Sequence, residues 1–124
     1  MTESVQTGTI LSIDPKKHRI RIHKSTLHAL GDPRYIQLLV STNRRIVAVK
    51  CVDKVMSGDQ SYRVNSEMLG PDNSCEIYSS SFIKELCSVV GGLDESGTYR
   101  LLGKIIETQR MAIFAMDTIA RVES

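Results

Sequence analysis

Closely spaced cations are the strongest chemical feature of this sequence. Residues 19–23 read Arg-Ile-Arg-Ile-His, an alternation typical of a β-strand with isoleucines on one face and basic side chains on the other. Two lysines precede this strand, a third follows it, and two arginines stand at an expected hairpin tip. Cations at this spacing suit the phosphates of a nucleic-acid backbone. The predicted phosphate-binding residues are Lys16, Lys17, Arg19, Arg21, Lys24, Arg44 and Arg45.

The same cations also have a purely structural explanation, because Lys and Arg on an exposed strand face keep a sheet from aggregating. No aromatic residue is interleaved with them for base stacking, so recognition of single strands is not favoured. No set of side chains is placed to read base edges, so any DNA binding is expected to be weakly sequence-specific. A continuous basic face would favour DNA. Pairing of the cations with Glu76, Glu85 or Glu107 would instead favour a protein-interaction or scaffold module without nucleic acid.

Patterns typical of catalysis or metal binding are weak. The three histidines recur every five residues, which places the first two on opposite faces of a strand. The three cysteines lack CxxC spacing and lie in or beside apolar stretches, which predicts buried thiols. No enzymatic activity, catalytic residue, metal or cofactor is therefore predicted. The histidines and cysteines are His18, His23, His28, Cys51, Cys75 and Cys87.

Length and composition favour one soluble domain. The chain has 124 residues, of which 41% are hydrophobic and 24% charged. No stretch approaches the roughly 20 apolar residues that a membrane helix needs. The N-terminus lacks the apolar segment of a signal peptide, and an odd number of scattered cysteines does not suggest disulfides. We therefore expect a cytoplasmic protein without a membrane partner.

Charge is divided unevenly between the two halves. Residues 1–54 contain ten Lys or Arg and four acidic residues, whereas residues 55–124 contain six and ten. This division suggests a polyanion such as DNA facing the first half. It equally suggests that the basic and acidic halves contact each other, within one chain or between subunits. A third interpretation is a solvated division without a function. For a scaffold module, the acidic second half would be the face that binds a protein partner.

Alternating and continuous apolar residues indicate an antiparallel, strand-rich chain with two helices. Ser25 and Ser79 are expected to cap the two helices at their N-termini. The helices are predicted over residues 25–30 and 79–90, and the strands over 7–14, 19–23, 35–41, 45–52, 62–64, 75–78, 98–107 and 110–116, with 118–122 as a strand or a helical turn.

The order strand, helix, strand, strand occurs twice. Residues 22–27 align with 77–82, residues 35–38 with 99–102, and residues 45–49 with 110–114, at offsets of 55, 64 and 65. One such unit cannot bury both faces of its apolar hairpin, so two units are expected to pack about a pseudo-twofold axis. The predicted fold is a single α+β domain over residues 1–124, with an antiparallel, barrel-like or clamp-like sheet. It comprises a first repeat (7–54), a connection (55–74) and a second repeat (75–122).

Short motifs run through residues 7–53: Thr7-Gly8, Ile10, Ile13-Asp14, Arg19-Ile20-Arg21-Ile22, Leu30-Gly31, Ile36 and Ile46-Val47-Ala48-Val49. In these motifs the segment resembles the swapped-hairpin domain of AbrB-like transition-state regulators, which implies an intertwined homodimer that binds DNA. Arg19 matches that family's basic residue at the start of the second strand. Where the family has further arginines, this chain has Leu11 or Ser12, Leu27 and His28, so most of the DNA contacts that the resemblance implies are missing.

The duplicated order also looks like a single domain of a sliding DNA clamp, a likeness of topology without a shared motif. Because the second unit lies in the same chain, an internal pseudo-dimer is expected to replace the exchanged dimer of the AbrB-like family. The chain is therefore predicted to be a monomer or a weak homodimer.

Overall fold

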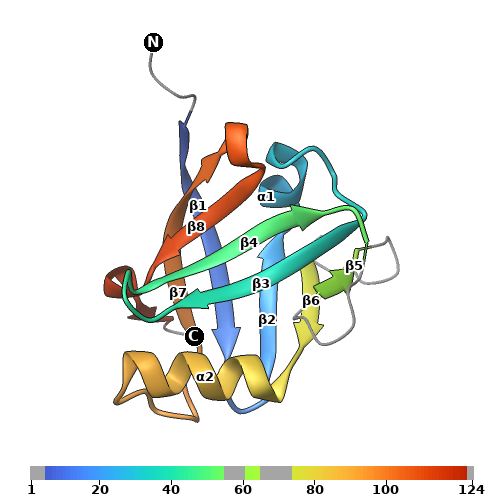
Figure 1. The fold of residues 1–124 in the computed structure, drawn as a ribbon. Coiled ribbons are helices and arrows are strands. Elements are labelled where there is room, and N and C mark those ends of the chain that lie inside the picture. Colours follow the sequence, from blue (N-terminus) through green and yellow to red (C-terminus); the bar gives the residue numbers. More distant parts are fainter. Residues whose placement is uncertain (1–4, 55–60, 65–73, 123–124) are drawn as a thin grey trace.

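A computed structural model describes residues 5–54, 61–64 and 74–122 of the chain. Its strands are β1 (Val5–Asp14), β2 (Arg19–His23), β3 (Tyr35–Ser41), β4 (Ile46–Val52), β5 (Ser61–Arg63), β6 (Ser74–Tyr78), β7 (Tyr99–Ile106), β8 (Met111–Ala115) and β9 (Ala120–Arg121). They form one sheet in the order β5-β3-β4-β8-β7-β1-β2-β6, and β9 pairs with β7. Figure 1 shows this sheet curling into a nearly closed barrel.

Every strand pairing in the described residues is antiparallel, so the predicted antiparallel α+β class is confirmed. β4 lies between β3 and β8 and is buried on both faces at Val47, Ala48 and Val49, as its continuous apolar run predicts. Part of the predicted connection, residues 55–60 and 65–73, lies outside the described residues. The short strand expected near Tyr62 is β5.

The two helices, α1 (Lys24–Ala29) and α2 (Ser80–Val90), cover opposite ends of the barrel (Figure 1). The predicted cap of α2 is confirmed, because the hydroxyl oxygen of Ser79 accepts a hydrogen bond from the backbone N–H of Phe82. The predicted cap of α1 is wrong: Ser25 lies within the helix, and His23 occupies the N-cap position without a side-chain bond. β2 runs directly into α1, so the last strand residue takes the position that a loop serine would otherwise hold.

Neither helix in the described part of the chain is long and apolar enough to span a membrane.

The core follows from strand register. Ile20 of β2 lies opposite Ile13 of β1 and Ile77 of β6, and all three side chains are buried. Because side chains alternate along a strand, Arg19 and Arg21 must then lie on the outer face of the barrel. The alternation in the sequence thus places Arg19 and Arg21 outside the barrel, beside the outward-facing side chains of β1 and β6.

Three hairpins share one loop geometry. The four-residue loops 15–18, 42–45 and 107–110 each end in a non-glycine residue with positive φ: His18 (53°), Arg45 (53°) and Arg110 (49°). Arg45 therefore lies in the turn, and the strand expected from residue 45 begins at Ile46. A 3₁₀ turn (Met116–Thr118) precedes β9, so the segment expected as a strand or a helical turn over residues 118–122 contains a short strand.

Candidate nucleic-acid interface

Strand register places acidic residues directly beside the two arginines of β2. Arg19 pairs across the sheet with Asp14 of β1, and Arg21 pairs with Glu76 of β6. Directly opposite residues on antiparallel strands have close Cβ atoms, so their charges interact. Glu76 is one of the three acidic residues considered above as partners of the cations, and the β2–β6 pairing brings it beside Arg21 although the two are 55 residues apart.

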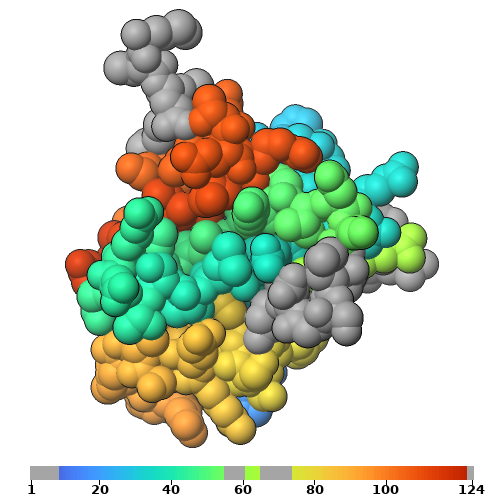
Figure 2. Space-filling view, in the orientation of Figure 1, coloured from blue at the N-terminus to red at the C-terminus, as the bar shows by residue number. Residues whose placement is uncertain are grey.

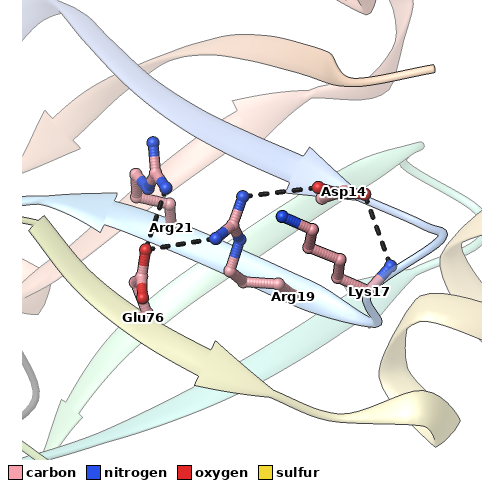
Figure 3. Close-up of polar contacts among 5 residues, drawn as sticks. All are labelled: Asp14, Lys17, Arg19, Arg21 and Glu76. Carbon is pink, nitrogen blue, oxygen red and sulfur yellow. Dashed lines mark hydrogen bonds and ion pairs between the residues drawn. The ribbon is translucent and has the colours of Figure 1, made fainter. Parts of the chain in front are cut away.

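The resulting ion-pair network is half-buried (Figure 3). Glu76 Oε2 accepts from Arg21 Nη2 at 2.8 Å and lies 3.4 Å from Arg19 Nη1, and Arg19 Nη2 lies 3.3 Å from Asp14 Oδ2. The side chains of Arg19 and Arg21 are only 18% and 29% exposed. Their charge is therefore balanced within the protein, and they do not form an open basic face.

The lysines around β2 are separated by the strand itself. Lys16 and Lys17 lie on the exposed β1–β2 turn, and neither makes an ion pair with another described residue. Lys24 is also exposed but follows the other end of β2, about 16 Å away for a five-residue strand. The turn thus carries two available cations, and Lys24 stands apart from them.

The β3–β4 hairpin tip approaches the C-terminal end of α2. Arg45 donates from Nη1 to the carbonyl oxygen of Val89 at 3.3 Å, and its Nε lies 3.3 Å from Asp117 Oδ1. Arg44 beside it is exposed. In Figure 2 this tip and α2 lie on the same side of the molecule. Arg44 therefore adds to the cations at the α2 end of the barrel, whereas Arg45 is engaged in internal contacts.

An open groove of about 620 Å³ lies between the β1–β2 turn, α2 and the loop after α2. We refer to it as the α2 groove. Lys16 and His18 line it from the turn, Lys84 from the helix and Glu95 from the loop. The sequence analysis did not identify Lys84 as a candidate, because this lysine lies in the acidic half of the chain and only the apolar face of its helix forms a recognisable pattern. A lysine on the polar face of an amphipathic helix gives no signal of its own.

The cysteines differ in their burial. Cys51 and Cys75 are buried as predicted, whereas Cys87 is half-buried and lines the α2 groove, so the prediction of a buried thiol is wrong for Cys87. Burial, and to a lesser degree the neighbouring Glu76, raises the pKa of Cys75 to about 11. The Cys75 thiol is therefore protonated at neutral pH.

The histidines lie in different parts of the fold. His18 is in the β1–β2 turn, His23 ends β2, and His28 lies in α1 with its Nδ1 3.0 Å from Asp32 Oδ2. The described residues contain no group of three His, Cys, Asp or Glu side chains able to hold a metal ion.

Comparisons with known proteins add no relative. No protein-family model matches the chain, and no curated protein or solved structure matches it either.

Proposed function

We propose that this protein is a non-enzymatic DNA-associated protein that contacts phosphates weakly through the α2 end of its barrel. The observation that carries the proposal is the pair Lys16 and Lys17, exposed on the β1–β2 turn without an ion pair to another described residue. Lys84 of α2 lines the same groove as Lys16, and Arg44 lies near the other end of α2. These four residues are the α2-end cations.

The dimensions support contact with several phosphates. An 11-residue helix such as α2 is about 16 Å long, which spans about five phosphates along one strand of a duplex. The exposed carboxylates of Glu85 and Glu95 belong to the same elements and oppose a polyanion. Binding is therefore expected to be weak, salt-dependent and without strong sequence preference.

Titration of a labelled short duplex by fluorescence anisotropy tests this function. Four phosphate contacts predict a loss of affinity of about 100-fold between 50 and 200 mM salt. An affinity for duplex and single strands that is absent, or that does not respond to salt, would contradict the proposal.

A second candidate function, a protein-interaction module without nucleic acid, is favoured by the Asp14–Arg19–Glu76–Arg21 network. The network removes two cations from any phosphate surface and leaves the outer face of β2 nearly neutral. This candidate predicts a protein partner and no binding of DNA in the same titration.

We also infer that the two halves are an internal duplication, and strand register supports it. The β2–β6 pairing is centred on Arg21 and Glu76, which are 55 residues apart, and the β4–β8 pairing on Ala48 and Ile113, which are 65 apart. These are offsets at which the sequence itself aligns. A twofold axis that passes through an antiparallel pair of strands requires the central residue of one strand to lie opposite the corresponding residue of the other repeat.

Two hydrogen bonds support the same axis. Cys51 N–H donates to the carbonyl of Arg110 at 3.0 Å, and Met116 N–H donates to the carbonyl of Arg45 at 2.9 Å. The two donors, Cys51 and Met116, are 65 residues apart, and so are the two acceptors, Arg45 and Arg110. Amide hydrogen exchange is expected to protect Cys51 and Met116 to a similar degree, and free exchange at only one of them would contradict the duplication. The resemblance to AbrB-like and clamp-like domains stays a prediction.

A further inference from the structure

The α2 groove has the size and chemistry of a small-molecule site. Its volume of about 620 Å³ lies within the range of roughly 300–1,000 Å³ that is typical of such sites. Its lining combines lysines from two different elements with half-buried Cys87, above a floor formed by the buried residues Pro15 and Ile83. Charged groups from several elements around one groove can orient a small polar ligand.

The wall formed by the β1–β2 turn is held in place by hydrogen bonds. His18 N–H donates to the carbonyl of Pro15 at 3.2 Å, and Lys17 N–H donates to Asp14 Oδ1 at 3.4 Å (Figure 3). The carbonyl of His18 accepts from Ser79 N–H at 2.9 Å, which fixes the turn to the start of α2. Lys16 is thus carried on a backbone that is already positioned against the helix.

The wall formed by the loop after α2 is fixed in the same manner. Asp94 Oδ1 accepts from both the backbone N–H and the hydroxyl of Ser96, at 2.9 and 2.8 Å. These bonds, with a smaller effect of Arg121, lower the pKa of Asp94. Asp94 N–H also donates to the Tyr99 hydroxyl at 2.7 Å. A site with two fixed walls loses little conformational entropy when a ligand binds.

We propose that the α2 groove binds a phosphate monoester of mononucleotide size, with Lys16 and Lys84 on its phosphate. A monoester carries about 1.5 to 2 negative charges at neutral pH, which matches two lysines better than a carboxylate does. The inference shares Lys16 and Lys84 with the proposed DNA surface but does not depend on DNA binding.

Glu95 restricts the ligand further. Its carboxylate lines the groove close enough to Cys87 to contribute, after burial, to the raised pKa of that thiol. A carboxylate repels a second phosphate and accepts hydrogen bonds, so the part of the ligand beside Glu95 carries hydroxyl or amino groups. A nucleoside monophosphate meets these requirements, whereas a di- or triphosphate is disfavoured.

Titration of the full chain with adenosine monophosphate, followed by amide NMR shifts, tests this site. We expect shifts in residues 16–18, 83–88 and 95–96, and at least tenfold weaker binding of adenosine. Lys84→Gln is expected to weaken binding by about tenfold, because a charge-assisted contact to phosphate is lost. Lys24→Gln removes an exposed lysine at the opposite end of β2 and is the matched control, with unchanged affinity expected.

The absence of shifts at about 10 mM nucleotide, a concentration that detects even millimolar affinity, would overturn the inference. Equal affinities for adenosine and adenosine monophosphate would also overturn it. So would an equal loss of nucleotide affinity in the Lys84→Gln and Lys24→Gln variants. The native amide spectrum of each variant reports that it is folded. Nucleotide binding without DNA affinity leaves this site standing and contradicts only the DNA proposal. DNA affinity without nucleotide binding supports the DNA proposal and contradicts only the nucleotide site.

Discussion

At the scale of single residues, the two arginines of β2 are governed by what lies opposite them on neighbouring strands. Glu76 faces both guanidinium groups, and Asp14 faces one of them. Strand alternation indicated that Arg19 and Arg21 lie on the outer face. It did not indicate which of the candidate acidic residues pairs with them, because Glu76 reaches them only through the β2–β6 pairing.

Glu76→Gln tests the role of this network. Loss of the carboxylate leaves two half-buried cations close together, so the free energy of unfolding is expected to fall by about 1–3 kcal/mol, between the values for exposed and buried ion pairs. Affinity for duplex DNA is expected to rise severalfold, because a negative charge beside Arg19 and Arg21 is removed. Urea denaturation and the anisotropy titration measure the two effects. Glu85→Gln, an exposed carboxylate on α2, is the stability control, and a DNA affinity that falls in Glu76→Gln would contradict this interpretation.

Thiol reactivity provides a second residue-scale prediction. Burial and Glu76 raise the pKa of Cys75 from an ordinary value near 9 to about 11, so its thiolate is scarce in the folded state. At about pH 8, iodoacetamide should label half-buried Cys87 well before Cys75. Because the unfolded thiol ionises first, this group's contribution to stability is present below about pH 9 and is lost as the pH rises towards 11. Equal labelling rates at Cys75 and Cys87 in the native protein, followed by mass spectrometry, would be inconsistent with this burial.

At the scale of elements, the β7–β8 hairpin depends on a glycine at its closest approach. A Cβ atom on Gly103 would lie 2.2 Å from the carbonyl oxygen of Ile113 and 2.6 Å from the Phe114 ring. Gly103→Ala is therefore expected to lower the free energy of unfolding by about 2–3 kcal/mol, since backbone has to move. Leu102→Ala, an exposed change on the same strand, should cost less than about 1 kcal/mol. Similar values for the two variants in chemical denaturation would argue against this close contact.

The hairpin loops allow a stabilising change. Arg110 has a positive φ of 49° at the end of its loop, a conformation that costs a non-glycine residue about 1 kcal/mol. Arg110→Gly should therefore raise the free energy of unfolding by about 0.5–1 kcal/mol. Gln109→Gly, one residue earlier in the 3₁₀ turn, should lower it, because that position gains nothing from glycine. A lower melting temperature for Arg110→Gly would show that its side chain contributes more than its backbone costs.

Local sequence patterns predicted most of these elements because each strand and helix carries its own periodicity. The alternating Arg19–His23 strand and the Ser79 cap are examples in which neighbouring residues alone decide the structure. The predicted Ser25 cap was wrong because the junction of β2 and α1 left no loop between them. The α2 groove could not be predicted, since Lys16, Lys84 and Glu95 meet only through the packing of three segments.

At the scale of the whole molecule, the fold separates the predicted basic residues into groups with different surroundings. Arg19, Arg21 and Arg45 are engaged by acidic groups, Lys24 lies beyond the far end of β2, and Lys16 and Lys17 remain available at the α2 end. Ion pairs such as Arg21–Glu76 and Arg45–Asp117 therefore neutralise part of the positive charge of the first half with carboxylates of the second half. The predicted monomer or weak homodimer and the predicted cytoplasmic location stay predictions.

The salt dependence of DNA affinity in two lysine variants tests phosphate binding by the α2 end most directly. Lys17→Gln should lower the slope of log affinity against log salt by about one, because one phosphate contact is lost. Lys24→Gln should leave the slope unchanged, since Lys24 lies about 16 Å away at the other end of β2. Equal effects of the two variants, or no measurable affinity of the wild-type chain for DNA, would contradict this account.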